Sequence, residues 1–385
     1  EKNLFGKANL QPVAAAMLTR GTKTMTRSEI EDRMTELKMA GSITNFTTTR
    51  KNLPAALELV FDAMHNSIMP QDEFDQFKKQ MQVMIESMRD KPDALAQNAI
   101  TQHFNTYPKG DPRYEYSLDE SLEQLNKLTV DQVRAFYKEF GGTSRGEISI
   151  VGDFDPKAVE KIIRDDYAKY VSKAHYAPVV TEYRPVKATR VVIDTPDKEN
   201  AIIVARSVFP INDTAPDAPA LTVANWILGG GTGLSNRLIE RLRQKEGLSY
   251  GAGSHVRIPA KGNNGSFVFR AIVAPQNMLQ AEASARDVIA KAVKDGITDQ
   301  EVAEAKKGLL QAMQVARSQD DVVARSWNDK MENKRTWAFS KKQAEAISKL
   351  TTADVNAALR KYIKPDDITF VLAGDQKKAA QKKQD

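Results

Sequence analysis

The stretch Arg-Leu-Arg-Gln-Lys-Glu-Gly-Leu-Ser-Tyr, residues 241–250, joins a predicted helix to a predicted strand. Leucines recur every four residues up to Leu242 and give the helix one apolar face, and Gly247 supplies the left-handed backbone that ends many helices. An alternating run from Tyr250 to Val256 then predicts the strand. The segment therefore sets Arg243 in a last helical turn and Tyr250 at the start of a strand, where their side chains can converge on one point.

The same two residues also have a purely structural interpretation. A cation in the last turn complements the helix dipole, and an aromatic side chain suits a half-buried strand. The glycine run ahead of them, Gly229-Gly230-Gly231-Thr232-Gly233, is likewise compatible with a tight turn between two helices. It is not a nucleotide-binding loop, because Leu-Ser-Asn follows it instead of the Lys-Ser/Thr of a P-loop, and a dinucleotide fingerprint needs a third glycine at a set spacing.

The composition is that of a soluble globular protein of about two domains, with 385 residues, 41% hydrophobic and 28% charged. No apolar run approaches the roughly 18 to 20 residues of a membrane span. The net charge of +6 is spread among acidic residues, so we expect neither a membrane nor a nucleic acid as a partner. The absence of cysteine excludes disulfides and thiolate zinc sites. It favours a periplasmic or otherwise secreted location, although a cytoplasmic one stays open.

The chain repeats itself once. An offset of 222 (350 − 128) relates Leu128-Thr129 and Gly152-Asp153 to Leu350-Thr351 and Gly374-Asp375. An offset of 228 (301 − 73) relates Glu73 and Lys78-Lys79 to Glu301 and Lys306-Lys307. An offset of 210 (224 − 14) relates Ala14, Leu18 and Gly21-Thr22 to Ala224, Leu228 and Gly231-Thr232. Offsets that differ by a few residues are what insertions in surface loops produce. Three matches in the same order therefore indicate two tandem homologous units.

Each unit is predicted to be a mixed or mostly antiparallel sheet covered by helices, which is an α+β fold. A helix leads to a strand that ends in Gly-Asp in both units. In the second unit the strand candidates are 190–194, 201–208, 250–256, 266–272 and 368–373, and helical periodicity covers 217–228, 236–246, 278–294, 299–318 and 353–362. We expect the first unit at 1–175, a linker at 176–186, the second unit at 187–375 and a frayed Lys/Gln-rich tail at 376–385.

The first unit is expected to lack its opening strands. The second unit has two predicted strands, at about 186–209, before its first helix, whereas subtracting 210 places the equivalent helix of the first unit at about 7–18. We therefore expect Glu1 not to be a natural domain start and the chain to be the C-terminal part of something longer. An unpaired sheet edge would follow, and another chain is expected to cover it.

Residues 228–253 resemble the C-terminal half of the pitrilysin/insulinase-family zinc peptidases. Arg243 and Tyr250 are separated by six residues, which include Lys-Glu-Gly-Leu, and the glycine run comes shortly before them; the similarity extends over most of the chain. In that family this arginine and tyrosine reach across to a zinc site on the N-terminal half, and the glycine loop can lie against the peptide substrate. The resemblance implies that Arg243 and Tyr250 are catalytic and that the substrate-binding residues are Gly229, Gly230, Gly231 and Gly233.

The zinc motif itself is missing. In the family, His-x-x-Glu-His lies on a helix that runs into Lys/Arg-Gly-Thr, here residues 20–22, and counting back puts Pro12, Ala15 and Ala16 at the motif positions. None of these can bind a metal, so we expect no metal site here and zinc on a zinc-motif-bearing partner half. The four histidines have no ligand spacing, and Glu86, on a helix that resembles the carrier of the family's distant ligand, is expected to be an ordinary carboxylate.

Two functions of different classes stay open. The chain is the zinc-free half of a two-part zinc metalloendopeptidase, closing over a peptide and donating Arg243 and Tyr250 to the composite active site, or it is a catalytically silent structural or peptide-binding relative of the same fold. The intact arginine and tyrosine favour the first hypothesis, because a purely structural relative does not need them.

Overall fold

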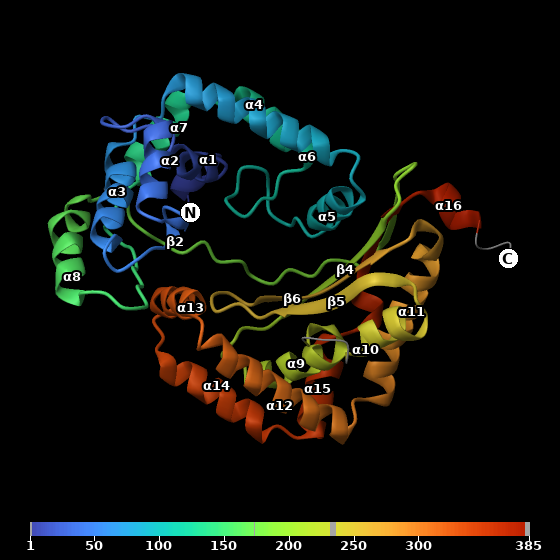
Figure 1. Ribbon diagram of the computed structural model, residues 1–385. Helices are drawn as coiled ribbons and strands as arrows, with labels where there is room; N and C mark the ends of the chain where they lie inside the picture. The colour runs from blue at the N-terminus through green and yellow to red at the C-terminus, as the bar shows by residue number, and fades with distance from the viewer. Residues whose placement is uncertain (1, 173, 232–235, 382–385) are drawn as a thin grey trace.

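The computed structural model describes residues 2–172, 174–231 and 236–381 and has the predicted α+β class. Helices of two units form an arc around a single five-stranded sheet, which belongs to the second unit (Figure 1). Within the described part of the chain, every helix is too short or too polar to cross a membrane.

The sheet has the strand order β3-β7-β4-β6-β5. Its strands are β3 (Arg190–Asp194), β4 (Ala201–Pro210), β5 (Ser249–Arg257), β6 (Asn264–Val273) and β7 (Thr369–Gly374). β3 and β7 run parallel and the other neighbours antiparallel, so the sheet is mixed, as predicted. β4 and β7 are central and read as nearly continuous apolar runs, because both of their faces are covered.

Helices of the second unit cover one face of this sheet. The longer helices that enter its core are α9 (Ala218–Asn225), α11 (Met278–Asp295), α12 (Asp299–Ala316), α14 (Trp337–Lys349) and α15 (Thr352–Tyr362). The opposite face receives α5 (Pro92–His103) of the first unit, whose Ala96 and Ile100 form an apolar cluster with Ile202 and Val204 of β4. A helix of the first unit therefore closes the second face of the sheet, which stabilises the arrangement of the two units.

The first unit is almost entirely helical. Besides α5 it contains α1 (Leu10–Met17), α2 (Arg27–Glu36), α3 (Leu53–Asn66), α4 (Gln71–Met88), α6 (Leu118–Lys127), α7 (Val130–Phe140) and α8 (Pro156–Asp165). They pack around a core of their own that includes the fully buried Met17 and Phe74. Its strands, as far as the described residues go, are the short antiparallel pair β1 (Ala40–Ser42) and β2 (Asn45–Thr47).

The predicted repeat is present in the helices. α12 begins and ends 228 residues after α4 (299 − 71, 316 − 88), and α15 begins and ends 222 residues after α7 (352 − 130, 362 − 140). One partly buried contact repeats as well. Lys78 Nζ donates to the carbonyl of Leu128 at 3.0 Å, and Lys306 Nζ donates to the carbonyl of Leu350 at 2.7 Å. The two units thus share helix lengths and the way in which their helices are joined.

The strand predicted to end at Gly152 and Asp153 is not formed, and residues 146–151 have irregular backbone. The corresponding strand of the second unit, β7, lies between β3 and β4 and bonds to both. The described part of the first unit offers residues 146–151 no such neighbours. A strand without neighbours leaves its N–H and C=O groups unpaired, so an extended ladder gives no advantage there.

The predicted tail also differs from expectation at its start, because residues 376–381 form the helix α16 (Gln376–Gln381). The carboxylate of Asp375 accepts bonds from the backbone N–H groups of Lys377 and Lys378, as an N-terminal cap does. Ala379 is buried against the core of the second unit. Capping and burial together stabilise residues 376–381 as a helix, whereas the composition predicted a frayed tail.

The segment predicted to be a linker, residues 176–186, has irregular backbone that is bonded to both units. The Tyr183 N–H donates to Asn263 Oδ1 at 2.7 Å, and Arg184 donates to the carbonyl of Thr106 at 2.8 Å. The Arg184 guanidinium also stacks on the ring of Tyr107, 4.1 Å from its centroid. These contacts fix the segment in one path between the units.

Candidate functional site

Tyr250 lies on the edge strand β5 at an irregularity in the ladder. Ser249 pairs with Val273 and Gly251 with Ile272, so Tyr250 is the extra residue of a β-bulge. The buried Ser249 hydroxyl holds the bulge, since its Oγ lies 2.7 Å from the Gly251 carbonyl and 2.9 Å from the Ile272 carbonyl. The bulge turns Tyr250 out of the alternation of the strand, and 66% of this residue is exposed.

Arg243 lies on the segment that precedes β5. The helix begins as α10 (Arg237–Ile239) and continues as the π-helix η4 (Glu240–Lys245), and Gly247 follows with a φ of +61°, as the sequence predicted. Leu242 is fully buried, and its carbonyl accepts from the Leu248 N–H at 2.8 Å, which ties η4 to the start of β5. Arg243 and Tyr250 therefore lie at the two ends of one short, packed connection.

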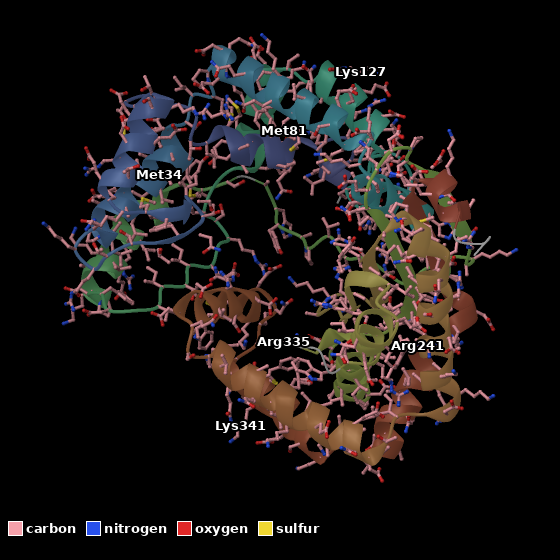
Figure 2. All side chains as sticks on the ribbon, turned by 45° about the vertical axis from the view of Figure 1, so that its right-hand side comes forward. Met34, Met81, Lys127, Arg241, Arg335 and Lys341 are labelled. Carbon is pink, nitrogen blue, oxygen red and sulfur yellow. The ribbon has the colours of Figure 1, made fainter. Side chains whose placement is uncertain are left out.

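Among the described residues, Arg243 differs from its charged neighbours in having no partner. Lys245 pairs with Glu240 at 2.8 Å, and Arg241, marked in Figure 2, pairs with Glu246. The side chain of Arg243 is exposed and makes no ion pair or hydrogen bond with any residue that the structure describes. Within the described structure, the Arg243 guanidinium is unpaired and the Tyr250 phenol is exposed, so both groups are available to a ligand or a partner outside this chain.

Close packing leaves little room for a side chain at the described glycines of the predicted substrate loop. Gly229 and Gly230 end the π-helix η3 (Trp226–Gly230), which lies against β5. A Cβ on Gly229 would stand 2.7 Å from the Ser254 backbone nitrogen, and one on Gly230 would stand 2.3 Å from Asn225 Nδ2. A Cβ on Gly231 would stand 3.0 Å from the Trp226 carbonyl. Gly233 lies outside the described residues, and contact of this loop with a substrate stays a prediction.

Sequence reasoning missed Arg206 on β4, whose guanidinium lies 4.8 Å from the ring centroid of Phe104. Its Nε is buried without an acceptor in the described structure. Burial, and secondarily the charge of nearby Arg257 on β5, lower the pKa of Arg206. The signal was present in the sequence, because Arg206 is the one charged residue in the apolar run 201–210. Arg206 thus places a partly buried positive charge beside Phe104, the residue that follows α5.

The positions of the absent zinc motif lie on α1. Pro12 and Ala15 are exposed and Ala16 is partly exposed, and none carries a group that can bind a metal, so the residues present do not fit a zinc ion. Glu86 on α4 pairs with Arg89 at 3.0 Å. Among the described residues, no three His, Asp or Glu side chains gather closely enough to hold a metal ion.

Two of the four histidines have clear structural partners. The ring of His65 stacks on Tyr170 with centroids 4.8 Å apart, and it meets Phe61 edge to face at 5.1 Å. His103 Nε2 lies 2.9 Å from the carbonyl of Lys187, so it holds the end of α5 against the chain that enters β3. These contacts agree with the structural interpretation that the spacing favoured.

Comparison with known proteins gives a consistent picture. Residues 127–309 match the family model described as the peptidase M16 inactive domain. An uncharacterized zinc protease of Mycobacterium bovis is 24% identical over 299 residues, which cover 74% of this chain and 66% of that protein, so the match spans just under two thirds of the relative. The Helicobacter pylori protein named non-peptidase homolog YmxG is 20% identical over 256 residues, 66% of this chain and 58% of that protein.

A solved structure has the same fold. The crystal structure of a peptidase M16 inactive domain from Pseudomonas fluorescens superposes with a TM-score of 0.78 and 21% sequence identity, covering 94% of this chain and 87% of that one. The likeness therefore includes both units, although the family model matches only the part from α6 to α12.

Proposed function

We propose that this chain, which belongs to the peptidase M16 family as its inactive, zinc-motif-lacking half, closes over a peptide held by a zinc-bearing half and donates Arg243 and Tyr250 to the composite active site. The observation that carries the proposal is the state of these two side chains. Both are exposed at one edge, and the guanidinium has no partner in the described residues, whereas its charged neighbours are paired. A surface cation without a counter-ion is ready to meet an anionic or carbonyl group of another molecule.

The chemistry of the two groups fits peptide hydrolysis. When a peptide carbonyl is attacked, negative charge grows on its oxygen, and donors aimed at that oxygen stabilise the transition state more than the ground state. Tyr250 has a hydroxyl donor, and Arg243 has a planar guanidinium that stays charged. Because this chain lacks the metal motif, the donors meet the oxygen only after the two halves close. Closure and catalysis are then coupled.

The partners follow from the same proposal. The zinc ion belongs to the partner half, since Pro12, Ala15 and Ala16 offer it no ligand. The substrate is a peptide, and the relatives named zinc protease support this class. A periplasmic or secreted location, which a cysteine-free chain suits, is part of the proposal.

The test is to combine this chain with an M16 chain that carries an intact His-x-x-Glu-His motif from the same source and to measure peptide hydrolysis. We expect hydrolysis by the pair and none by either chain alone. Tyr250→Phe removes one hydroxyl from an exposed side chain, so it should lower kcat by about a hundred- to thousandfold while zinc content and circular dichroism stay unchanged.

The alternative is a catalytically silent relative that binds or stabilises a partner. The similarity to a protein named non-peptidase homolog favours it. The same experiment separates the two functions, because a silent relative forms the pair without any effect of Tyr250→Phe. Turnover within about twofold of the unmodified pair would therefore establish the alternative.

A further inference from the structure

A small cavity in the second unit is lined by two cations. It lies between α12, α13 (Asp320–Glu332) and α14 and has a volume of about 150 Å³. Met313, Val322 and the indole of Trp337 form apolar parts of its wall. Lys330 and Arg317 supply the cations. The cavity is distant in sequence from the edge that carries Tyr250 and has no part in the function proposed above.

Lys330 is buried without a carboxylate partner. Only 8% of its surface is exposed, and its ammonium lies 4.2 Å from the ring centroid of Trp337. It donates to Ser326 Oγ at 2.5 Å and, more weakly, to the Ser326 carbonyl at 3.4 Å, and both of these acceptors are uncharged. The neighbouring carboxylate of Asp329 instead accepts a bond from Asn333, and no described acidic residue lies within ion-pair distance of Lys330.

Arg317 brings a second positive charge to the same cavity. Its guanidinium lies 5.8 Å from the Trp337 centroid, and it too forms no ion pair within the described structure. A nearby arginine in the sequence shows the contrast, since Arg335, labelled in Figure 2, donates to Asp213 at 2.6 Å. Two cations converge on one indole here, and no acidic residue in the described part of the chain forms an ion pair with either of them.

Such an arrangement is costly without a ligand. A lysine that is almost fully buried is normally paired, because its charge loses hydration on burial. Burial lowers the pKa of Lys330, and the like charge of Arg317 lowers it further, whereas Asp329 opposes the shift. Cation–π attraction to Trp337 offsets only part of this cost. An anion in the cavity would replace the lost hydration of Lys330 and could at the same time pair with the exposed Arg317.

We propose that this cavity binds a carboxylate borne on a small apolar group. The carboxylate bonds to Lys330 at the bottom and to Arg317 at the rim, and the apolar group packs on Met313, Val322 and Trp337. A cavity of this size holds a group of about six carbon atoms. The same chemistry is found in a free branched-chain acid and in the C-terminal residue of a peptide, so the test includes both.

Binding is measured by titration calorimetry on the full chain with 4-methylpentanoate and with its amide, which has the same shape without charge. We expect the acid to bind and the amide to bind at least about tenfold more weakly, since hydrogen bonds between charged groups are the stronger ones. Lys330→Met should weaken binding of the acid at least about tenfold. Lys341→Met is the matched control, because Lys341 lies on the outer side of α14 with 79% of its side chain exposed, and it should have no effect (Figure 2).

A second arm distinguishes the two sources of the carboxylate. The peptide Ala-Ala-Ala-Ala-Leu and its C-terminal amide are titrated in the same way. Binding of the peptide acid at least as tightly as 4-methylpentanoate, with loss on amidation, assigns the cavity to peptide C-termini. Binding of the small acid alone assigns it to a free metabolite-sized acid.

The thermal midpoint Tm keeps the proposal testable if binding is weak. Without ligand, Lys330→Met should leave Tm unchanged or raise it, because it replaces an unpaired buried charge by an apolar chain of similar length. Only the unmodified chain should gain Tm on addition of the acid. Equal binding of acid and amide, or a large drop in Tm for Lys330→Met without ligand, would overturn the proposal, since the lysine would then act through packing alone.

Discussion

The two units have matching helices, but among the described residues only the second unit forms an extended sheet. α4 and α12 have the same length, as have α7 and α15, and Thr129 and Thr351 cap α7 and α15 with the same reciprocal box. A capping box needs only residues three positions apart, so local sequence is sufficient for it. A strand needs neighbours. The comparison teaches that the helices of this fold are specified locally, whereas its sheet depends on segments from far along the chain.

A repeated ion pair shows how far the likeness extends. Glu73 on α4 accepts from Arg27 at 3.4 Å, and Glu301 on α12 accepts from Arg237 at 2.6 Å. Glu73 has a second arginine, Arg20, at 3.1 Å, whereas Glu301 takes part in the capping box at the start of α12. In both units, therefore, the third residue of the long helix is a glutamate. It pairs with the arginine that begins a shorter helix, α2 in the first unit and α10 in the second.

The exposed edge of the second unit has no equivalent in the first. Arg33, on the corresponding helix α2, is bonded to Glu36 at 2.9 Å, while Arg243 has no partner in the described structure. The β1–β2 pair of the first unit carries Ala40 and Gly41 at its start, without a tyrosine. If the units have divided their roles, changes at matched positions should have unequal effects.

The largest difference in the effect of a substitution on kcat is expected between Arg243 and Arg33. Arg243→Lys in the complete pair of halves should lower kcat by about a hundredfold, because an ammonium cannot reproduce the planar fork of donors. Arg33→Lys should leave kcat within about twofold, since it loses only an exposed pair. Steady-state hydrolysis of one peptide by both variants checks this. Equal losses would mean that the edge of the second unit has no special role.

Gly229→Ala is expected to destabilise the second unit by about 2 kcal/mol, because the new methyl group would stand 2.7 Å from the Ser254 nitrogen and 2.8 Å from Leu238 Cδ1. Gly251→Ala is the control, as nothing lies within 4 Å of a Cβ there. Urea unfolding followed by circular dichroism measures both. A neutral Gly229→Ala that nevertheless lowers hydrolysis would instead point to contact between this loop and the substrate.

Low pH should destabilise the second unit by protonating Glu301. Burial by itself would raise the pKa of this carboxyl, but bonds from Arg237 and from Thr298 outweigh it and lower the pKa from 4.5 to about 2. Because the pKa in the folded state is depressed, the stabilisation is present above about pH 4.5 and is lost as the pH falls towards 2. Partial exposure reduces it to on the order of 1 to 2 kcal/mol.

Hydrogen exchange of α12 between pH 6 and pH 3 measures this contribution. Glu301→Gln should remove the acid dependence of α12, and Glu304→Gln, one turn further along on the exposed side, should retain it. An acid dependence that survives Glu301→Gln would show that another group controls α12.

The smallest effect is expected at Ser249. Ser249→Ala removes the hydroxyl that bonds across the bulge, so we expect a loss of about 1 kcal/mol in stability and a fall of several-fold in kcat from a less well oriented Tyr250. Since Ser249 acts through Tyr250, the fall should vanish in the Tyr250→Phe background. An undiminished fall in the double variant would contradict this coupling.

Much of the fold was accessible from the sequence because its signals are local. The repeat offsets of 228 and 222 relate α4 to α12 and α7 to α15, and Gly247 was recognised as a helix end, which its φ of +61° confirms. Periodicity over 201–208 and 266–272 also placed two central strands, since both are long apolar runs. The pair Arg243 and Tyr250 was found by resemblance, and its catalytic role stays a prediction.

The rest was decided by tertiary structure. Residues 146–151 read as a strand, yet without neighbours to bond they stay irregular. The tail became α16 because Asp375 caps it and Ala379 finds a core to pack on. The bulge at Tyr250, the crowding at Gly229 and the convergence of Arg317 on Lys330 each depend on atoms far apart in sequence. Sequence periodicity indicates the local conformation of a segment. Only the packed chain determines which groups from distant segments come into contact, pair their charges or form hydrogen bonds.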